Sequence, residues 1–457
     1  MRSRALPLFV LSAVLSCKTA GDAASSASDA GPSSDHPGGR PRAPSDHPGG
    51  RPRAPSDHPG GRSTASPEDA LGPPTQHQLP TTDGAISLGN LTGQIDYFEP
   101  ATRTAPGLDG GARPSGFPSA ALQIVPLLAT RSQYVGRVAD AERALAVAED
   151  LVRAAPDQAS SYVARARART GMHLFTAALA DLAEAEKRGA RPAALVGPRA
   201  TILEGQGDLD GALALRRAER AARPDLVNTT LEASLLGQMG KTREAADLFA
   251  QAPAHYNDVS VFPVAWLFLQ EGLFWERAGE TARARAFYAA AHERLPAYGH
   301  AASHLALLEP PARGIELLLP IVAASDDPEF ELILAGRLRA AGQAAEADTR
   351  LAHVRARYAE LVDKHPEAYA EHAGWFLLDE GKDPERAYAL AQQNLTVRRT
   401  EKAYQLALLA ALAAGKRADA CTLGAAAGKL PYASEMLRGI AEGACKPSSP
   451  EGASPKP

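Results

Sequence analysis

Alanine recurs at a nearly constant interval through the middle of this chain. Ala144, Ala178, Ala212 and Ala245 follow one another at spacings of 34, 34 and 33 residues. Between them, apolar residues return every three or four positions, which is the period of one face of an α-helix. This register indicates one short helical unit repeated in tandem, because such a unit can bury its apolar face only against its neighbours.

A second spacing accompanies the first. In five places a glycine precedes such an alanine by five residues, where a chain that leaves one helix benefits from a positive φ. In three places a proline follows the alanine by 12 residues and stops the second helix. The glycines are Gly207, Gly240, Gly279, Gly342 and Gly415, and the prolines are Pro156, Pro224 and Pro296.

These anchors resemble the tetratricopeptide repeat (TPR), a helix–turn–helix unit of about 34 residues. The resemblance implies an all-α, right-handed α-solenoid of about eight or nine hairpins over residues 119–445. A generic alanine-rich helical bundle is the alternative, but the repeated glycine-to-alanine spacing favours the solenoid. The copy at residues 266–296 carries the family's small and aromatic positions at Gly272, Trp275, Ala284, Tyr288, Ala291 and Pro296.

Composition agrees with helices packed closely together. Hydrophobic residues make up 45% of the 457 residues but aromatic residues only 5%, so the core must consist mainly of alanine and leucine. That favours helices over a β-sandwich or β-barrel. The chain has 49 basic and 53 acidic residues, a formal net charge of −4, which argues against a strongly electrostatic nucleic-acid binder.

The N-terminus reads as an export signal. Arg2 and Arg4 precede an apolar stretch, Ala5–Leu15, that is too short to span a bilayer as a helix. Val14–Cys17 resembles the bacterial lipobox, which implies that residues 1–16 are a signal peptide and that Cys17 is lipidated. An ordinary secretory signal with a chance cysteine is the alternative. By resemblance to Gram-negative lipoprotein sorting patterns, Lys18 after the cysteine implies sorting to the outer membrane, facing the periplasm.

Residues 17–118 are expected to form a disordered tether, and residues 446–457 a disordered tail. The tether contains an 11-residue tandem repeat whose apolar side chains are no larger than alanine or proline, so little offsets the entropy of ordering it. Residues 84–100 contain scattered apolar side chains and are expected to add a short extended piece that docks on the folded body. The repeats are Ser34–Pro44, Ser45–Pro55 and the partial copy Ser56–Arg62.

Two cysteines remain after Cys17. Export would place Cys421 and Cys445 in an oxidising space, where disulfides persist. Their midpoint lies beside the expected turn at residues 430–432, so helices near 416–429 and 433–444 would bring them face to face. We expect a disulfide that locks the last helix as a cap of the solenoid. Two buried free thiols are the alternative.

The sequence contains no strong catalytic motif, and no cofactor or metal is expected. His300 and His304 lie four residues apart and could share a helix face, as metal ligands do. No third ligand stands at a fixed spacing from them, so helix-packing histidines are the favoured interpretation. A metal-dependent hydrolase that uses His300 and His304 is retained as the alternative enzymatic hypothesis.

Stacked hairpins would present a concave groove lined by the first helix of each unit. The family resemblance places a partner-binding groove at recurring positions of these helices. Trp266, Leu269 and Leu273 would form an apolar stripe there, either exposed as a binding anchor or buried in the core or under residues 84–118. The groove residues are Arg167, Thr201, Glu204, Thr230, Ser234, Gln238, Trp266, Leu269, Leu273, Glu276, Arg277 and Arg339.

The sequence thus favours a non-enzymatic, membrane-tethered scaffold that binds a protein or peptide partner in the bacterial cell envelope. An assembly factor for an envelope complex is a more specific version, by family analogy only. A self-associating structural module is a further alternative. The identity of the partner and the oligomeric state are left open.

Overall fold

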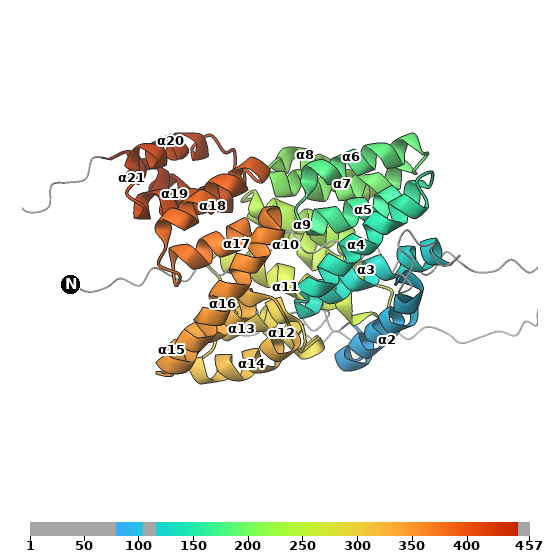
Figure 1. The fold of residues 1–457 in the computed structure, drawn as a ribbon, viewed down its shortest axis with the longest axis horizontal. Coiled ribbons are helices and arrows are strands. Elements are labelled where there is room, and N and C mark those ends of the chain that lie inside the picture. The colour runs from blue at the N-terminus through green and yellow to red at the C-terminus, as the bar shows by residue number, and fades with distance from the viewer. Residues whose placement is uncertain (1–78, 104–115, 447–457) are drawn as a thin grey trace, which may run out of the picture.

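The computed structural model describes residues 79–103 and 116–446. These residues form 20 α-helices and one short 3₁₀-helix, Ala252–His255, and no strands (Figure 1). The prediction of an all-α fold is confirmed. The predicted signal peptide, Cys17, the tandem repeats and the C-terminal tail lie outside the described residues.

Eighteen of the helices pair into nine successive hairpins, in agreement with the predicted eight or nine. Helix α2 (Gly84–Thr102) precedes them and α21 (Glu435–Cys445) follows them. The hairpins are α3 (Phe117–Val135) with α4 (Val138–Ala154), α5 (Ala159–Gly171) with α6 (Phe175–Lys187), α7 (Pro192–Gln206) with α8 (Leu209–Ala222), α9 (Leu226–Gln238) with α10 (Thr242–Gln251), α11 (Val261–Arg277) with α12 (Thr281–Arg294), α13 (Gly299–Leu308) with α14 (Pro311–Ala324), α15 (Pro328–Ala340) with α16 (Ala344–Lys364), α17 (Pro366–Leu378) with α18 (Pro384–Val397), and α19 (Glu401–Ala413) with α20 (Arg417–Ala427).

The glycine and alanine anchors occupy the positions that their chemistry predicts. Each of the five turn glycines has a positive φ, between 72° and 93°. The alanines that follow them are fully buried. Gly272 in α11 lies so close to the ring of Tyr288 in α12 that a Cβ atom would approach Tyr288 Cε1 to 2.4 Å. This TPR-like pair therefore fixes the closest approach within one hairpin.

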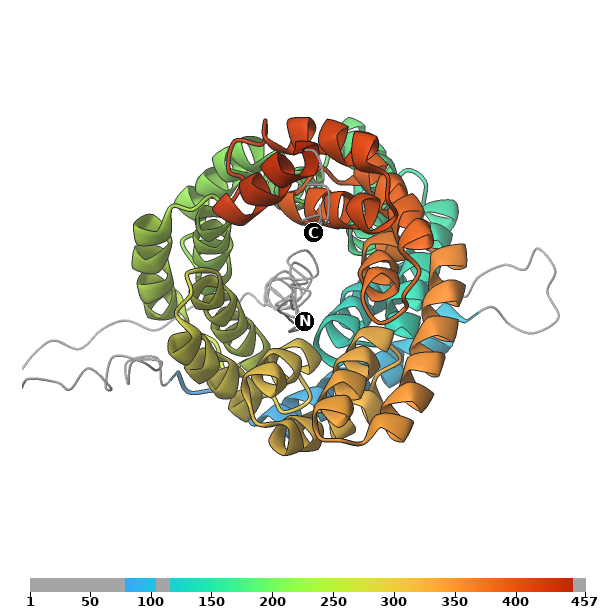
Figure 2. The same ribbon diagram turned by 90° about the vertical axis from the view of Figure 1, so that its left-hand side faces the viewer.

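The first helices of the hairpins form the inner layer of a curved structure. Neighbouring first helices contact one another, as α5 does α7, α9 does α11 and α17 does α19. No two successive second helices make comparable contact in the described part of the chain. First helices therefore converge and second helices diverge, which curves the stack around the first helices. Figure 2 shows the hairpins arranged around a ring.

The curvature brings hairpins far apart in sequence into contact. Asp326, between α14 and α15, accepts hydrogen bonds from the amides of Val138 (2.6 Å) and Ala139 (3.1 Å) at the start of α4. Nearby, Nε2 of His365 lies 2.8 Å from Oε1 of Glu142. These contacts join the first hairpin to the sixth, seventh and eighth. The repeats thus wind into a superhelix whose successive turns touch.

Further contacts join later hairpins across successive turns of the superhelix. The backbone amide of Arg399 donates to the carbonyl oxygen of Gln206 at 3.2 Å. The hydroxyl of Tyr432 donates to Oδ1 of Asp210 at 2.6 Å. We call this set of contacts between successive turns the seam. It was not predicted from the sequence, which led us to expect an open groove.

Residues 84–102 differ from the prediction. They were expected to be disordered tether with a short extended piece, but they form α2, which packs on α3. The side chain of Asp83 caps the helix by accepting from the amides of Ala85 and Ile86. Leu91 and Ile95 are buried four residues apart on one helical face. Glycine and threonine between these residues weaken the helical pattern in the sequence.

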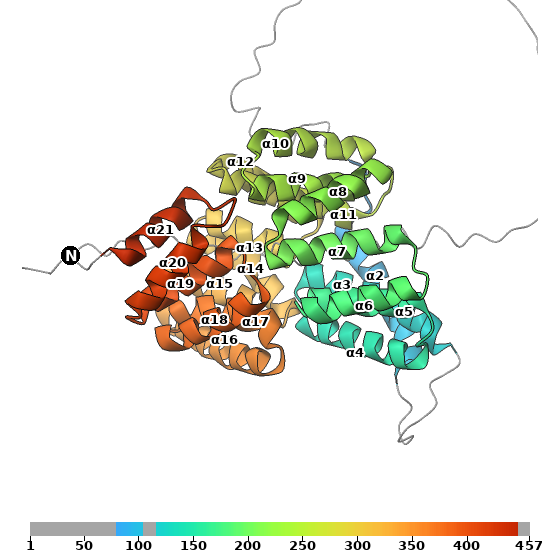
Figure 3. The ribbon, with the colours of Figure 1, turned by 90° about the horizontal axis from the view of Figure 1, so that it is seen from above.

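The C-terminal end is closed by α21, which lies against α19 and α20 (Figure 3). Cys421 in α20 and Cys445 at the end of α21 form a disulfide with their Cα atoms 4.6 Å apart. The inner face of α21 buries Leu437 and Ala441 in the terminal hydrophobic cluster. The disulfide therefore fixes the last helix over the end of the apolar stack.

Candidate functional site

Polar side chains of the first helices form a ladder on the inner layer. Glu204 in α7 and Gln238 in α9 occupy equivalent positions 34 residues apart, and Nε2 of Gln238 donates to Oε1 of Glu204 at 2.7 Å. One turn earlier in α9, the hydroxyl of Ser234 donates to Oε1 of Gln270 in α11 at 3.2 Å. These two bonds link three successive first helices through side chains.

Glu276 near the end of α11 continues the ladder. Its Oε2 accepts from the hydroxyl of Tyr288 at 2.5 Å and lies 3.2 Å from Nδ1 of His304 in α13. Burial acts to raise the pKa of Glu276, but the hydrogen bonds from His304 and Tyr288 outweigh it, so its pKa is lowered. Glu276 is therefore an ionised acceptor held in a fixed orientation.

Arg277, the last residue of α11, is the exposed member of this region. The carboxylates that act on its charge come from three first helices: Glu401 in α19, Glu276 in α11 and Glu204 in α7. The residue is exposed to solvent, but desolvation of its guanidinium by the surrounding protein is the largest effect on its pKa and lowers it, against the opposing charges of these carboxylates. We call Glu204, Gln238, Glu276, Arg277 and Glu401 the Arg277 patch.

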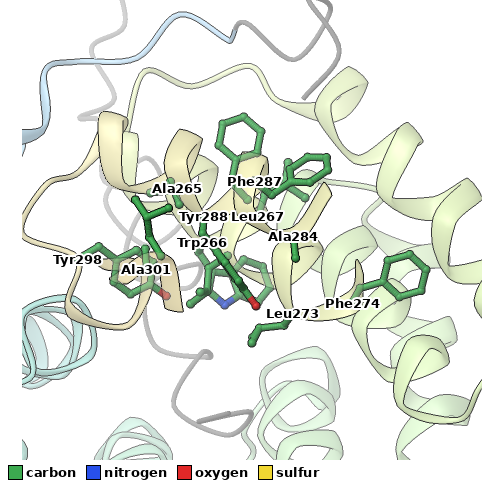
Figure 4. Packing of buried hydrophobic residues seen from close by; sticks show 14 of the residues in the cluster. Ala265, Trp266, Leu267, Leu273, Phe274, Ala284, Phe287, Tyr288, Tyr298 and Ala301 are labelled. Carbon is green, nitrogen blue, oxygen red and sulfur yellow. The ribbon is translucent and has the colours of Figure 1, made fainter. Parts of the chain in front are cut away.

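The predicted apolar stripe is not a surface. The side chains of Trp266, Leu269 and Leu273 are only 2%, 2% and 6% exposed. They belong to the hydrophobic cluster that also contains Tyr288 and Tyr298 (Figure 4). Of the two alternatives left open by the sequence, the structure supports burial in the core, so the stripe is wrong as an exposed binding anchor.

Other predicted groove residues also hold the fold together. Thr230 is fully buried and its hydroxyl donates to the carbonyl oxygen of Leu226. Thr201 accepts from the buried guanidinium of Arg216 at 3.0 Å. Arg339 is exposed but pairs with Asp348 at 2.7 Å and also with Glu380. These contacts lie within or between adjacent hairpins.

The remaining predicted positions are accessible to different degrees. Arg167, Ser234, Gln238 and Glu276 are half-buried, and Glu204 is buried beneath Gln238. Sequence reasoning missed Glu401, which starts α19 in the ninth hairpin and acts on the charge of Arg277 in the fifth. The sequence could not reveal this residue because the proximity of Glu401 to Arg277 depends on the curvature of the whole stack.

The two candidate metal ligands face different surroundings. His304 is buried and directs Nδ1 toward Glu276, whereas the ring of His300 packs against Phe330 with centroids 5.3 Å apart. Burial is the main cause that lowers the pKa of His300 to about 4. Residues 79–103 and 116–446 contain no group of three or more histidine, cysteine, aspartate or glutamate side chains arranged to hold a metal.

In the same ranges, no helix has the length and apolar character needed to cross a membrane.

No family model matches the sequence, and no curated protein matches it. Solved structures with a similar arrangement include a TPR protein from Parabacteroides merdae, at 17% identity and a TM-score of 0.33, covering 55% of this chain and 98% of that one. Another is the human IFIT1 dimer with PPP-AAAA, at 15% identity and a TM-score of 0.35, covering 78% of this chain and 80% of that one. The TPR domain of P58(IPK) has 18% identity and a TM-score of 0.22, and the match covers 72% of this chain and 97% of that one.

Similarity at this level does not extend to function. The TPR-like character of this chain rests on its own hairpins, turn glycines and buried alanines.

Proposed function

We propose that this protein is a non-enzymatic scaffold of the bacterial cell envelope that binds a protein partner through the Arg277 patch. The observation that carries the proposal is the side-chain ladder on the inner layer, beside which Arg277 is exposed at the end of α11. Arginine is enriched at protein interfaces because its fork donates several hydrogen bonds at once. The nearby carboxylates of Glu276 and Glu401 offer acceptors to the same partner.

The site is pre-formed. Gln238 and Glu276 are held by hydrogen bonds to Glu204, Tyr288 and His304, so little side-chain freedom is left to lose on binding. Pre-organised side chains reduce the entropic cost of association. A partner segment that donates hydrogen bonds to Glu276 and Glu401 while accepting from Arg277 would match this arrangement.

We further propose that the protein is exported and anchored in the outer membrane, facing the periplasm, through a lipid on Cys17. The proposal rests on the signal-like N-terminus and the lipobox-like residues before Cys17. The disulfide between Cys421 and Cys445 supports an oxidising compartment. Mass spectrometry of the purified protein would find an acylated N-terminal Cys17. An unmodified chain that begins at another residue would reject the anchor.

Crosslinking in cells tests the binding site. A photo-reactive amino acid at Gln238 or Arg277 is expected to capture one protein, while the same probe at Arg313, exposed on α14 of the outer layer, captures none. Trp266 is unsuitable for this experiment because it is buried. The purified partner should then lose at least about tenfold in affinity for the variant Arg277→Glu.

Two outcomes would reject the site. Capture from Arg313 but not from Arg277 would move binding to the outer layer. Capture only of a second copy of this chain, with a dimer seen by light scattering, would make the protein a self-associating module.

A further inference from the structure

The N-terminal described segment touches two hairpins that lie far apart in sequence. The amide of Thr82 donates to the carbonyl oxygen of Val259 at 2.7 Å. Arg294, at the end of α12, donates from Nη1 to the carbonyl oxygen of Leu79 at 2.7 Å and to Oγ1 of Thr81 at 3.1 Å. Residues 79–83 are thus fixed to the fifth hairpin, α11/α12, and to the loop before it.

Gly84 marks the closest approach of this segment to the fifth hairpin. A Cβ atom at this position would lie 2.4 Å from the carbonyl oxygen of Arg294 and 3.1 Å from Cα of Leu295. Because both of these atoms belong to the backbone, neither can move aside as a flexible side chain would. Only glycine lets the start of α2 lie against the end of α12.

The other end of α2 is bound to the first hairpin. Nε of Arg143 in α4 lies 3.1 Å from Oε1 of Glu99, and its Nη2 donates to the carbonyl oxygen and hydroxyl of Thr102. Leu91 and Ile95 are buried in the same hydrophobic cluster as residues of α3 and α4. Residues 79–102 therefore run from the fifth hairpin to the first (Figure 2).

We infer that residues 79–102 form a strap that holds the superhelix closed, and that detaching its N-terminal end opens the seam. Strap and seam act in parallel with the buried contact of Tyr134 in α3, whose hydroxyl donates to the carbonyl oxygen of Phe262 at 2.7 Å, because all three hold the first hairpin against the fifth to eighth hairpins. When one of several parallel connections breaks, the effective concentration of the remaining pairs of surfaces falls. Opening would free the first hairpin and widen the approach to the Arg277 patch.

The contacts differ in how easily they break. The N-terminal end of the strap is held by a few hydrogen bonds, by the partial burial of Leu79 and by the close approach at Gly84, whereas α2 has a whole apolar face buried on α3. Residues 1–78 join the strap at its weakly held end. A mechanical force transmitted through residues 1–78 therefore acts first on the contacts of residues 79–83. This inference concerns the closure of the fold and does not depend on the proposed partner.

Amide hydrogen exchange of the full chain tests the strap. Gly84→Val should detach residues 79–83 by collision with α12, and Gly89→Val is the matched control, because a Cβ atom at Gly89 has nothing within 4 Å. The amide of Thr82 reports the strap, and the amides of Val138 and Ala139 report the seam. In Gly84→Val all three should exchange roughly tenfold faster or more, and in Gly89→Val none should change.

A second variant keeps the test decisive if Gly84→Val does not fold. Arg294→Met retains an unbranched stem and removes the hydrogen bonds to Leu79 and Thr81, so it should accelerate the same three amides. Faster exchange at Thr82 with unchanged exchange at Val138 and Ala139 would overturn the inference. Equally faster amide exchange in every helix would also overturn the inference, because the whole fold would then open as one cooperative unit and the strap would not control the seam separately.

Discussion

Glu271 in α11 provides a quantitative test of how the inner layer is packed. Its side chain is only 6% exposed, and its Oε2 has no hydrogen-bond partner among the described residues. Burial raises its pKa to about 8, while the nearby indole of Trp275 and the charge of Arg283 act in the opposite direction. Glu271 is therefore a neutral carboxylic acid in the folded protein at neutral pH.

The sign of the pH effect follows from this difference. In the unfolded chain the pKa of Glu271 is near 4.5, so between 4.5 and about 8 the folded state binds a proton that the unfolded state does not. Stability therefore falls as pH rises through this window. Between pH 5 and pH 7 the loss is about 2.5 kcal/mol, because each pH unit contributes up to about 1.4 kcal/mol.

Glu271→Gln removes this titration while preserving the size of the side chain. Thermal unfolding from pH 5 to pH 8 is expected to show that the variant gains stability relative to the wild type as pH rises. Glu316→Gln, at an exposed position paired with Arg313, is the control and should run parallel to the wild type. Parallel curves for Glu271→Gln and the wild type would refute the assignment of a neutral buried acid.

Three further predictions concern packing, the cap and the seam. Gly272→Ala should destabilise the protein by about 1–3 kcal/mol through overpacking. Gly336 is helical and half-buried, and a Cβ atom there would have nothing within 4 Å, so Gly336→Ala should instead stabilise the protein by about 0.5–1 kcal/mol. Melting temperatures of both variants equal to that of the wild type would contradict both predictions. Reducing the disulfide between Cys421 and Cys445 should cost about 3 kcal/mol locally and let a protease cut α21; unchanged cleavage would argue against a locking role. Asp326→Ala should cost about 1 kcal/mol and speed exchange at the start of α4; unchanged exchange there would show that the carboxylate caps nothing.

Much of the fold was predictable because the repeat is encoded locally. The turn glycines need a positive φ and the buried alanines need close helix contact, so both appear in the sequence at fixed spacings. The terminal hairpin and its cysteines were also visible in the sequence. Helix α2 was missed because its apolar residues are interrupted by glycine and threonine.

The seam could not be predicted in the same way. Asp326 caps a helix 188 residues away in sequence, and such a pairing leaves no periodic signal. One local hint exists: Arg137, the residue before α4, has no side chain that can cap the helix. Other helices, such as α5 and α10, also start without a side-chain cap, so this hint does not single out α4.

The predicted apolar stripe failed for a related reason. Family positions describe an open superhelix in which the first helices meet solvent. Here the inner layer buries Trp266, Leu269 and Leu273 in the core and leaves polar residues such as Gln238 and Arg277 accessible. Which positions stay exposed depends on curvature, which is the sum of many small packing angles along the whole chain.

The central claim is that the superhelix closes on itself, and a crosslink across the seam tests it most directly. Glu142 in α4 and His365 beside α17 are 223 residues apart in sequence but lie in contact. The full chain with Glu142→Cys and His365→Cys, and with Cys17→Ser, would be treated with a short thiol-to-thiol crosslinker and analysed by peptide mass spectrometry. Closure predicts rapid intramolecular joining of positions 142 and 365, with little joining when His353→Cys replaces His365→Cys. An absence of the 142–365 crosslink, with both thiols reactive, would show an open solenoid and contradict the account.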